Sequence, residues 1–169
     1  EDGWSKKPHR ADEALRHLYG ADNGNVGLLC GTQSNGYCGL DLDAFKSIFL
    51  ETFPQFKDCK HVYRDNAPER IKFIIHIIDK VPLGNKVSIA ESPAGHHLEI
   101  LADATTGGGN NCVIAGRHET FAHVQVGGSQ ILEITYDELV KIWEKWTGTP
   151  FKYAVPVGPA APLPEHISE

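Results

Sequence analysis

The stretch Gly39-Leu40-Asp41-Leu42-Asp43 places two carboxylates one residue apart within an apolar run. Side chains of a strand alternate between its two faces, so a strand here puts Asp41 and Asp43 on one face, roughly 6 to 7 Å apart. Two unpaired carboxylates on one face repel each other and resist desolvation, and a divalent cation bound between them is the usual remedy. The pattern favours a buried strand with a metal-dependent phosphoryl-transfer site. The alternative is a pair of solvated acids at a strand end.

The flanks of this stretch predict another strand before it and a helix after it. Residues 25–31 form a short apolar run that ends at a glycine, and a glycine-bearing turn at 34–37 leads into the strand 38–42, so we expect a hairpin. Beyond Asp43, apolar residues recur at helical spacing until Pro54. The two acids therefore lie at the end of a sheet, where functional side chains rest on a rigid scaffold.

The rest of the chain predicts more strands than helices. A helix is expected at residues 10–19, and a capping box from Thr135 to Glu138 opens another that ends before Gly148. Further strands are expected at residues 61–63, 71–78, 87–90, 97–101, 111–115 and 121–126. This order indicates an α+β fold, a mixed sheet with helices packed against one or both faces.

Length and composition indicate a single globular domain. Of the 169 residues, 41% are hydrophobic and 22% charged, which suffices for a real core. We expect residues 1–150 to form the domain and the Pro- and Ala-rich residues 151–169 to be a tail or linker. No run approaches the roughly 18 apolar residues that span a bilayer, and the N-terminal residues lack the apolar core of a signal peptide, so we expect a cytoplasmic protein with no membrane partner. Since the chain lacks methionine and opens on glutamate, we expect it to be part of something larger.

The cysteines and the net charge bear on two further classes of protein. The cysteines have no CxxC spacing and are predicted to be free thiols: Cys30, Cys38, Cys59 and Cys112. Cys59 with His61 could supply half of a zinc site, which the sequence leaves open. The net charge of −6 argues against a simple nucleic-acid coat, although basic residues do cluster locally.

A second strand carries a further acid. In the expected strand 97–101, His97 and Glu99 share one face. A third carboxylate beside Asp41 and Asp43 would complete a cluster able to hold two Mg²⁺ or Mn²⁺ ions, the arrangement used for in-line displacement at phosphorus. Taken alone, a glutamate on a strand such as Glu99 is more often a solvated edge residue.

Three motifs follow one another between residues 4 and 128. They are Asn25-Val26-Gly27 with the stretch ending at Asp43, then the basic strand Arg70-Ile71-Lys72, then Glu99-Ile100-Leu101 with Val113-Ile114-Ala115-Gly116-Arg117-His118. Their order and spacing resemble the bifunctional primase-polymerase domain of the archaeo-eukaryotic primase superfamily. The resemblance implies an RRM-like primase catalytic core.

The resemblance also implies a role for each motif residue. Asp41, Asp43 and Glu99 match the acids that hold two Mg²⁺ or Mn²⁺ ions and carry catalysis, and the residues matching the triphosphate-binding positions are Arg70, Lys72 and His118. Basic groups suit that role because phosphate oxygens need charge-assisted donors as charge moves toward the leaving pyrophosphate.

The implied activity is that of a DNA primase or DNA polymerase, a nucleotidyltransferase. It would add nucleotides from dNTP or NTP to a 3′-hydroxyl on a single-stranded DNA template with a primer. The implied setting is plasmid, phage or archaeal replication, with a fused or associated helicase.

A second alignment with the family changes two assignments. Residues 92–97 imitate a Ser-x-Gly-x-His motif, which would make His97 the basic residue and move the third acid to Asp103 or Glu119. We prefer Glu99, because Asp103 lies in a stretch that is expected to be a loop.

Two other classes of protein stay open. One is a non-catalytic nucleic-acid-binding RRM-like module, which requires aromatic side chains exposed on a sheet, for which Tyr63 and Phe73 are the candidates. The other is a metal-dependent nuclease, which also places acids on strands.

Overall fold

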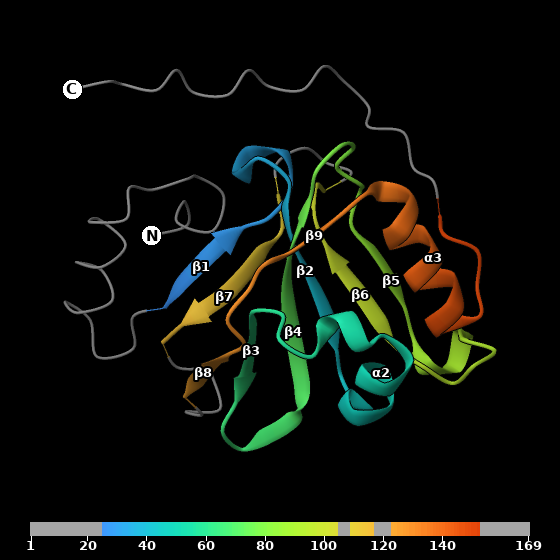
Figure 1. Cartoon of the computed structure of the whole chain (residues 1–169), viewed down its shortest axis with the longest axis horizontal. Coiled ribbons are helices and arrows are strands. Elements are labelled where there is room, and N and C mark those ends of the chain that lie inside the picture. Colours follow the sequence, from blue (N-terminus) through green and yellow to red (C-terminus); the bar gives the residue numbers. More distant parts are fainter. Residues whose placement is uncertain (1–24, 105–108, 117–122, 153–169) are drawn as a thin grey trace.

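The computed structural model describes residues 25–104, 109–116 and 123–152, and within them the fold is α+β (Figure 1). The strands are β1 (Val26–Leu29), β2 (Tyr37–Leu42), β3 (His61–Arg64), β4 (Ala67–Ile77), β5 (Asn85–Val87), β6 (Leu98–Leu101), β7 (Asn111–Ala115), β8 (Val124–Gly127) and β9 (Leu132–Ile134). The α-helices are α2 (Lys46–Thr52) and α3 (Tyr136–Thr147), and the 3₁₀ turns are η2 (Thr32–Ser34), η3 (Pro54–Phe56) and η4 (Ile89–Glu91). The helix expected at residues 10–19 lies outside the described residues.

Most strands join one large sheet in the order β5-β6-β2-β4-β3-β8. These neighbours are antiparallel. Strand β9 instead runs parallel to β4 and pairs with it beyond the position of His61, the first residue of β3. The predicted mixed sheet is confirmed. Strand β2 lies near its centre, so the stretch around Asp41 is held by backbone hydrogen bonds on both sides.

The expected hairpin between residues 25–31 and the strand 38–42 is wrong. Strand β2 already has β4 and β6 as neighbours, so it has no free edge for β1. Strand β1 instead pairs with β7 in a separate two-stranded sheet, the β1–β7 pair, and only one bridge, Gly31 to Tyr37, links its end to β2 (Figure 1).

One face of the large sheet packs against α2 and α3 and forms the main core. Alternation along β2 and β4 puts these apolar side chains on that face: Cys38, Leu40, Leu42, Ile71, Phe73 and Ile75. Phe49 of α2 stacks on Phe73, and its ring meets Trp146 of α3 edge-on. Each such fully buried side chain stabilises the fold by about 1.5 to 3 kcal/mol. Phe151, in the expected tail, is also buried here, against Trp143.

The helix ends follow local chemistry. The predicted capping box is confirmed, because Thr135 and Glu138 exchange hydrogen bonds at the start of α3, and Gly148 ends that helix with φ 68°. A second capping box, at Ser88 and Glu91, opens η4, so the expected strand 87–90 is wrong beyond Val87.

The opposite face of the large sheet is covered only in part. The β1–β7 pair packs over it through a smaller cluster of buried side chains: Cys30, Val62, Ile74, Leu101 and Cys112. All four cysteines are free thiols, as predicted. Next to this cluster the face carries charged side chains. None of the helices in the described residues is long and apolar enough to cross a membrane.

Candidate active site

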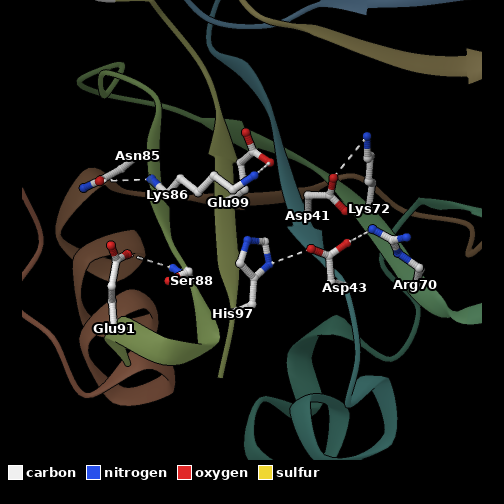
Figure 2. Close-up of polar contacts among 10 residues, drawn as sticks. All are labelled: Asp41, Asp43, Arg70, Lys72, Asn85, Lys86, Ser88, Glu91, His97 and Glu99. Carbon is white, nitrogen blue, oxygen red and sulfur yellow. Dashed lines mark hydrogen bonds and ion pairs between the residues drawn. The ribbon is translucent and has the colours of Figure 1, made fainter. Parts of the chain in front are cut away.

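Four charged side chains form one row across the partly covered face of the sheet. Asp41 on β2 is directly opposite Lys72 on β4 and Glu99 on β6, and Glu99 is directly opposite Lys86 on β5. Directly opposed residues of antiparallel strands share a face, so the order across the sheet is Lys86, Glu99, Asp41, Lys72 (Figure 2). The two acids are central and a lysine closes each end.

Both lysines contact the acid beside them. The Lys72 Nζ lies 3.1 Å from Asp41 Oδ2, and the Lys86 Nζ lies 3.4 Å from Glu99 Oε2. The Asp41 side chain is 17% exposed and that of Lys86 is 60% exposed, so the row runs from a half-buried centre to a solvated edge strand.

Asp43 belongs to a second row, one position beyond the end of β2. Arg70 of β4 donates a hydrogen bond to its Oδ1, and the Nδ1 of His97, just before β6, lies 3.2 Å from its Oδ2 (Figure 2). The predicted sharing of a face is confirmed for Asp41 with Asp43, and the ladder brings Arg70 and His97 to the same end. Side chains thus fix Asp43 where the backbone ladder has stopped.

His97 is almost fully buried, and its Nδ1 has no aligned hydrogen-bond partner. The contact with Asp43 is therefore electrostatic rather than a well-formed hydrogen bond. A buried ring nitrogen beside a carboxylate keeps an unused hydrogen-bonding capacity, which costs free energy unless another ligand satisfies it.

The two aspartates have opposite electrostatic environments. Burial raises the pKa of Asp41, the nearby Asp43 and Glu99 carboxylates add to the rise, and Lys72 only partly opposes it. Burial also acts to raise the pKa of Asp43, but the hydrogen bond and charge of Arg70 outweigh it and lower that pKa. Burial acts to lower the pKa of Lys72, but the interactions with Asp41 outweigh burial, so the pKa of Lys72 is raised. Of these two aspartates, Asp41 is the one whose negative charge the folded state disfavours.

Asp103, the alternative third acid, is engaged elsewhere. Its Oδ1 accepts a hydrogen bond from the Thr32 backbone N–H at 2.7 Å, and its Oδ2 accepts one from Thr32 Oγ1 at 2.5 Å. Both oxygens therefore tie the η2 loop to the end of β6. Glu99 is in the row with Asp41 and Asp103 is not, while Glu119 and His118 lie outside the described residues.

Cys59 and His61 do not point toward each other as zinc ligands would. The Cys59 thiol is buried and donates to the Ile74 carbonyl, and the His61 ring contacts the Cys59 carbonyl oxygen rather than its sulfur.

The three acids suit a hard divalent cation by their chemistry, since Mg²⁺ and Mn²⁺ prefer carboxylate oxygens. Within residues 25–104, 109–116 and 123–152, however, no three His, Cys, Asp or Glu side chains are gathered closely enough to hold a metal ion. At this site each of the three carboxylates is directed toward a basic partner (Figure 2).

Sequence reasoning missed Lys86. The strand was expected to start at residue 87, whereas β5 covers Asn85–Val87, and Asn85 and Val87 are buried on either side of Lys86. A recognised pairing of this strand with the one that carries Glu99 would have placed Lys86 beside it.

Comparison of the chain with family models, curated proteins and solved structures gave no match.

Proposed function

We propose that this chain is a DNA-directed nucleotidyltransferase of the primase-polymerase type with an RRM-like catalytic core. One observation carries the proposal. Three acids carried by two adjacent strands lie on one face of a sheet, and the neighbouring strand has Arg70 and Lys72 directly beside them. The order of the motifs along the chain supports the same proposal.

The acids have a defined role in this proposal. Asp41, Asp43 and Glu99 would hold two Mg²⁺ or Mn²⁺ ions, which would supply a polarised 3′-hydroxyl and neutralise charge on the reacting phosphate. The central strands fix the backbones of Asp41 and Glu99, so these carboxylates need little reorganisation when substrate binds.

Arg70 and Lys72 bind the triphosphate of the incoming nucleotide. Both side chains are partly exposed, at 48% and 34%, so phosphate oxygens can reach them from solvent. They lie two residues apart on β4, roughly 6 to 7 Å along the strand, a separation that the β and γ phosphates can span. Charge-assisted hydrogen bonds from them offset the charge that develops on the leaving pyrophosphate.

Two features of the structure weigh against the other classes. Phe73 is buried under the helices and Tyr63 is only half-exposed, so the sheet offers few aromatic platforms for a non-catalytic RRM-like module. The separate basic pair on β4 favours a triphosphate over the single phosphodiester that a metal-dependent nuclease would bind.

Primer extension tests the proposal. The full chain is incubated with Mn²⁺, a labelled primer annealed to a template, and dNTPs. We expect the primer to lengthen, and to stay unchanged with the Asp41→Asn, Asp43→Asn double variant. The matched control is Glu51→Gln, which removes an exposed carboxylate of α2 and should extend normally. Shortening of the primer would identify a nuclease instead, and an unchanged primer with wild type would refute catalysis.

A further inference from the structure

Every carboxylate of the site already has a basic partner from its own chain. Asp41 pairs with Lys72, Asp43 with Arg70, and Glu99 with Lys86. Three carboxylates thus pair with one arginine and two lysines, so the negative and positive charges of the cluster nearly cancel. A cation approaching it meets little net attraction.

The basic groups also occupy one oxygen of each carboxylate that a cation could use. The Nζ of Lys72 lies 3.1 Å from Asp41 Oδ2, and Arg70 engages Asp43 Oδ1. Metal–oxygen bonds of about 2.0 to 2.6 Å would bring a second positive charge against these groups. A metal ion on these two oxygens therefore requires Lys72 and Arg70 to turn away from them.

We infer that this site takes up a divalent cation and a polyphosphate together, by an exchange of partners in which Arg70 and Lys72 move from the carboxylates to the phosphates. The inference rests on the proposed function and adds that neither ligand binds well alone. A polyphosphate that draws away the two basic side chains frees the acids, and a cation that occupies the acids frees the basic side chains. By linkage, each ligand must strengthen the other by the same factor.

A polyphosphate suits the site better than a single phosphate, because it can engage both basic side chains and still offer oxygens to the cation. Arg70 and Lys72 project from the same face of β4, two residues apart, in adjacent rows. Orthophosphate has to share its oxygens among both basic groups and the cation, whereas a chain of two or three phosphates reaches from one row to the next and offers more oxygens. Arginine adds a planar pair of donors that matches phosphate geometry.

His97 can hold the Asp43 carboxylate in place during the exchange. When Arg70 leaves Asp43, the buried imidazole remains 3.2 Å from Asp43 Oδ2 and has an unused Nδ1. It can then donate a hydrogen bond to Asp43 and hold that carboxylate in place.

The first test measures Mn²⁺ binding to the full chain, without nucleotide, by electron paramagnetic resonance. Lys72→Met keeps the aliphatic stem and removes the competing charge, so Mn²⁺ should bind about tenfold more tightly than to wild type. Arg70→Met should act in the same direction and provides a second variant at a more exposed position. Lys57→Met, at an exposed lysine after η3, is the control and should leave Mn²⁺ affinity unchanged.

The second test compares three titrants: Mn²⁺ alone, inorganic tripolyphosphate alone, and their preformed complex. The complex should bind wild type about tenfold more tightly than either component, and Lys72→Met should lose most of this advantage. Orthophosphate with Mn²⁺ should show little of it.

Two results would overturn the exchange: Lys72→Met and Arg70→Met binding Mn²⁺ no more tightly than wild type, or the complex binding no more tightly than Mn²⁺ alone. Primer extension by wild type, run in parallel, separates the two proposals. If wild type extends the primer but the variants bind Mn²⁺ no more tightly than wild type, the exchange of partners is wrong and the proposed function stands. If the binding results are as expected but no primer is extended, the exchange stands and the polymerase activity is wrong.

Discussion

Asp41 and Glu99 stand directly opposite each other on β2 and β6, so the sheet holds two carboxylates on neighbouring strands. Side chains in such positions have Cβ atoms about 4.5 to 5.5 Å apart, and like charges there destabilise a sheet. Lys72 and Lys86 at the two ends of the row offset that repulsion. A sheet that keeps this pair at its centre gains nothing in stability from it, which is consistent with a functional role for the acids.

Neutralising the two aspartates should change stability in opposite directions. Asp41→Asn removes a half-buried charge that faces two other acids, and should raise the free energy of unfolding by up to about 1 kcal/mol in the absence of metal. Asp43→Asn removes the partner of Arg70 and, at a third exposed, should lower it by about 0.5 to 1 kcal/mol. Urea denaturation in EDTA measures both. Severe unfolding of Asp41→Asn would indicate a structural role for that carboxylate.

The same two variants should show opposite pH trends. The pKa of Asp41 lies above its ordinary 3.8, so the folded state holds this proton more tightly than the unfolded state. Its contribution to stability is complete below pH 3.8 and is lost as the pH rises through the folded-state pKa. The pKa of Asp43 is lowered, so its contribution is present above its ordinary value and is lost as the pH falls.

As the pH rises above about 4, the unfolding free energy of Asp41→Asn should therefore rise relative to wild type. That of Asp43→Asn should fall relative to wild type as the pH rises toward about 4, and the difference should then stay nearly constant at higher pH. Denaturation curves in EDTA at several pH values supply the comparison. Parallel trends in both variants would contradict this electrostatic description of the site.

Replacing the two candidates for the third acid should separate activity from stability. Glu99→Gln should remove primer extension by orders of magnitude with little change in stability, because Glu99 is partly exposed in the row. Asp103→Asn should cost about 1 to 3 kcal/mol of stability, since an amide cannot accept both hydrogen bonds from Thr32, yet the folded fraction should extend primers. The reverse ranking would restore the alignment in which His97 is the basic residue.

Lys72→Ala should weaken nucleotide binding rather than DNA binding. One lost charge-assisted hydrogen bond costs about 1.5 to 3 kcal/mol, seen as a rise in the apparent dNTP constant of extension. The salt dependence of DNA binding should hardly change, whereas loss of a template-phosphate contact would reduce its slope by roughly one unit. A reduced slope with unchanged dNTP dependence would assign this part of β4 to the template.

Local patterns predicted most elements of the fold. Period-two alternation put Asp41 and Asp43 on one face of their strand, and in the structure Leu40 is buried on the opposite face, because burial enforces strand register. The capping box at Thr135 located α3. The pairing of strands was harder. Nothing near Val26 indicates that β1 pairs with β7 rather than β2, since that choice depends on which edges the finished sheet leaves free.

For the candidate site, too, the faces within each strand were predictable from the sequence and the pairings between strands were not. Alternation placed Asp41 with Asp43 and His97 with Glu99, but only the register of β6 on β2 brings Glu99 opposite Asp41. Lys86 was missed because its strand begins two residues earlier than expected. The engagement of Asp103 by Thr32 joins positions 71 residues apart, a contact that no local pattern contains.

The most direct measurement supplies the full chain with Mn²⁺, a primer-template whose next template base is known, and one dNTP at a time, and counts nucleotides added and pyrophosphate released. The proposed function predicts that the complementary dNTP alone extends the primer efficiently, with one pyrophosphate for each nucleotide, and that Glu99→Gln does neither. Primer shortening, or pyrophosphate release that does not depend on the template base, would contradict it.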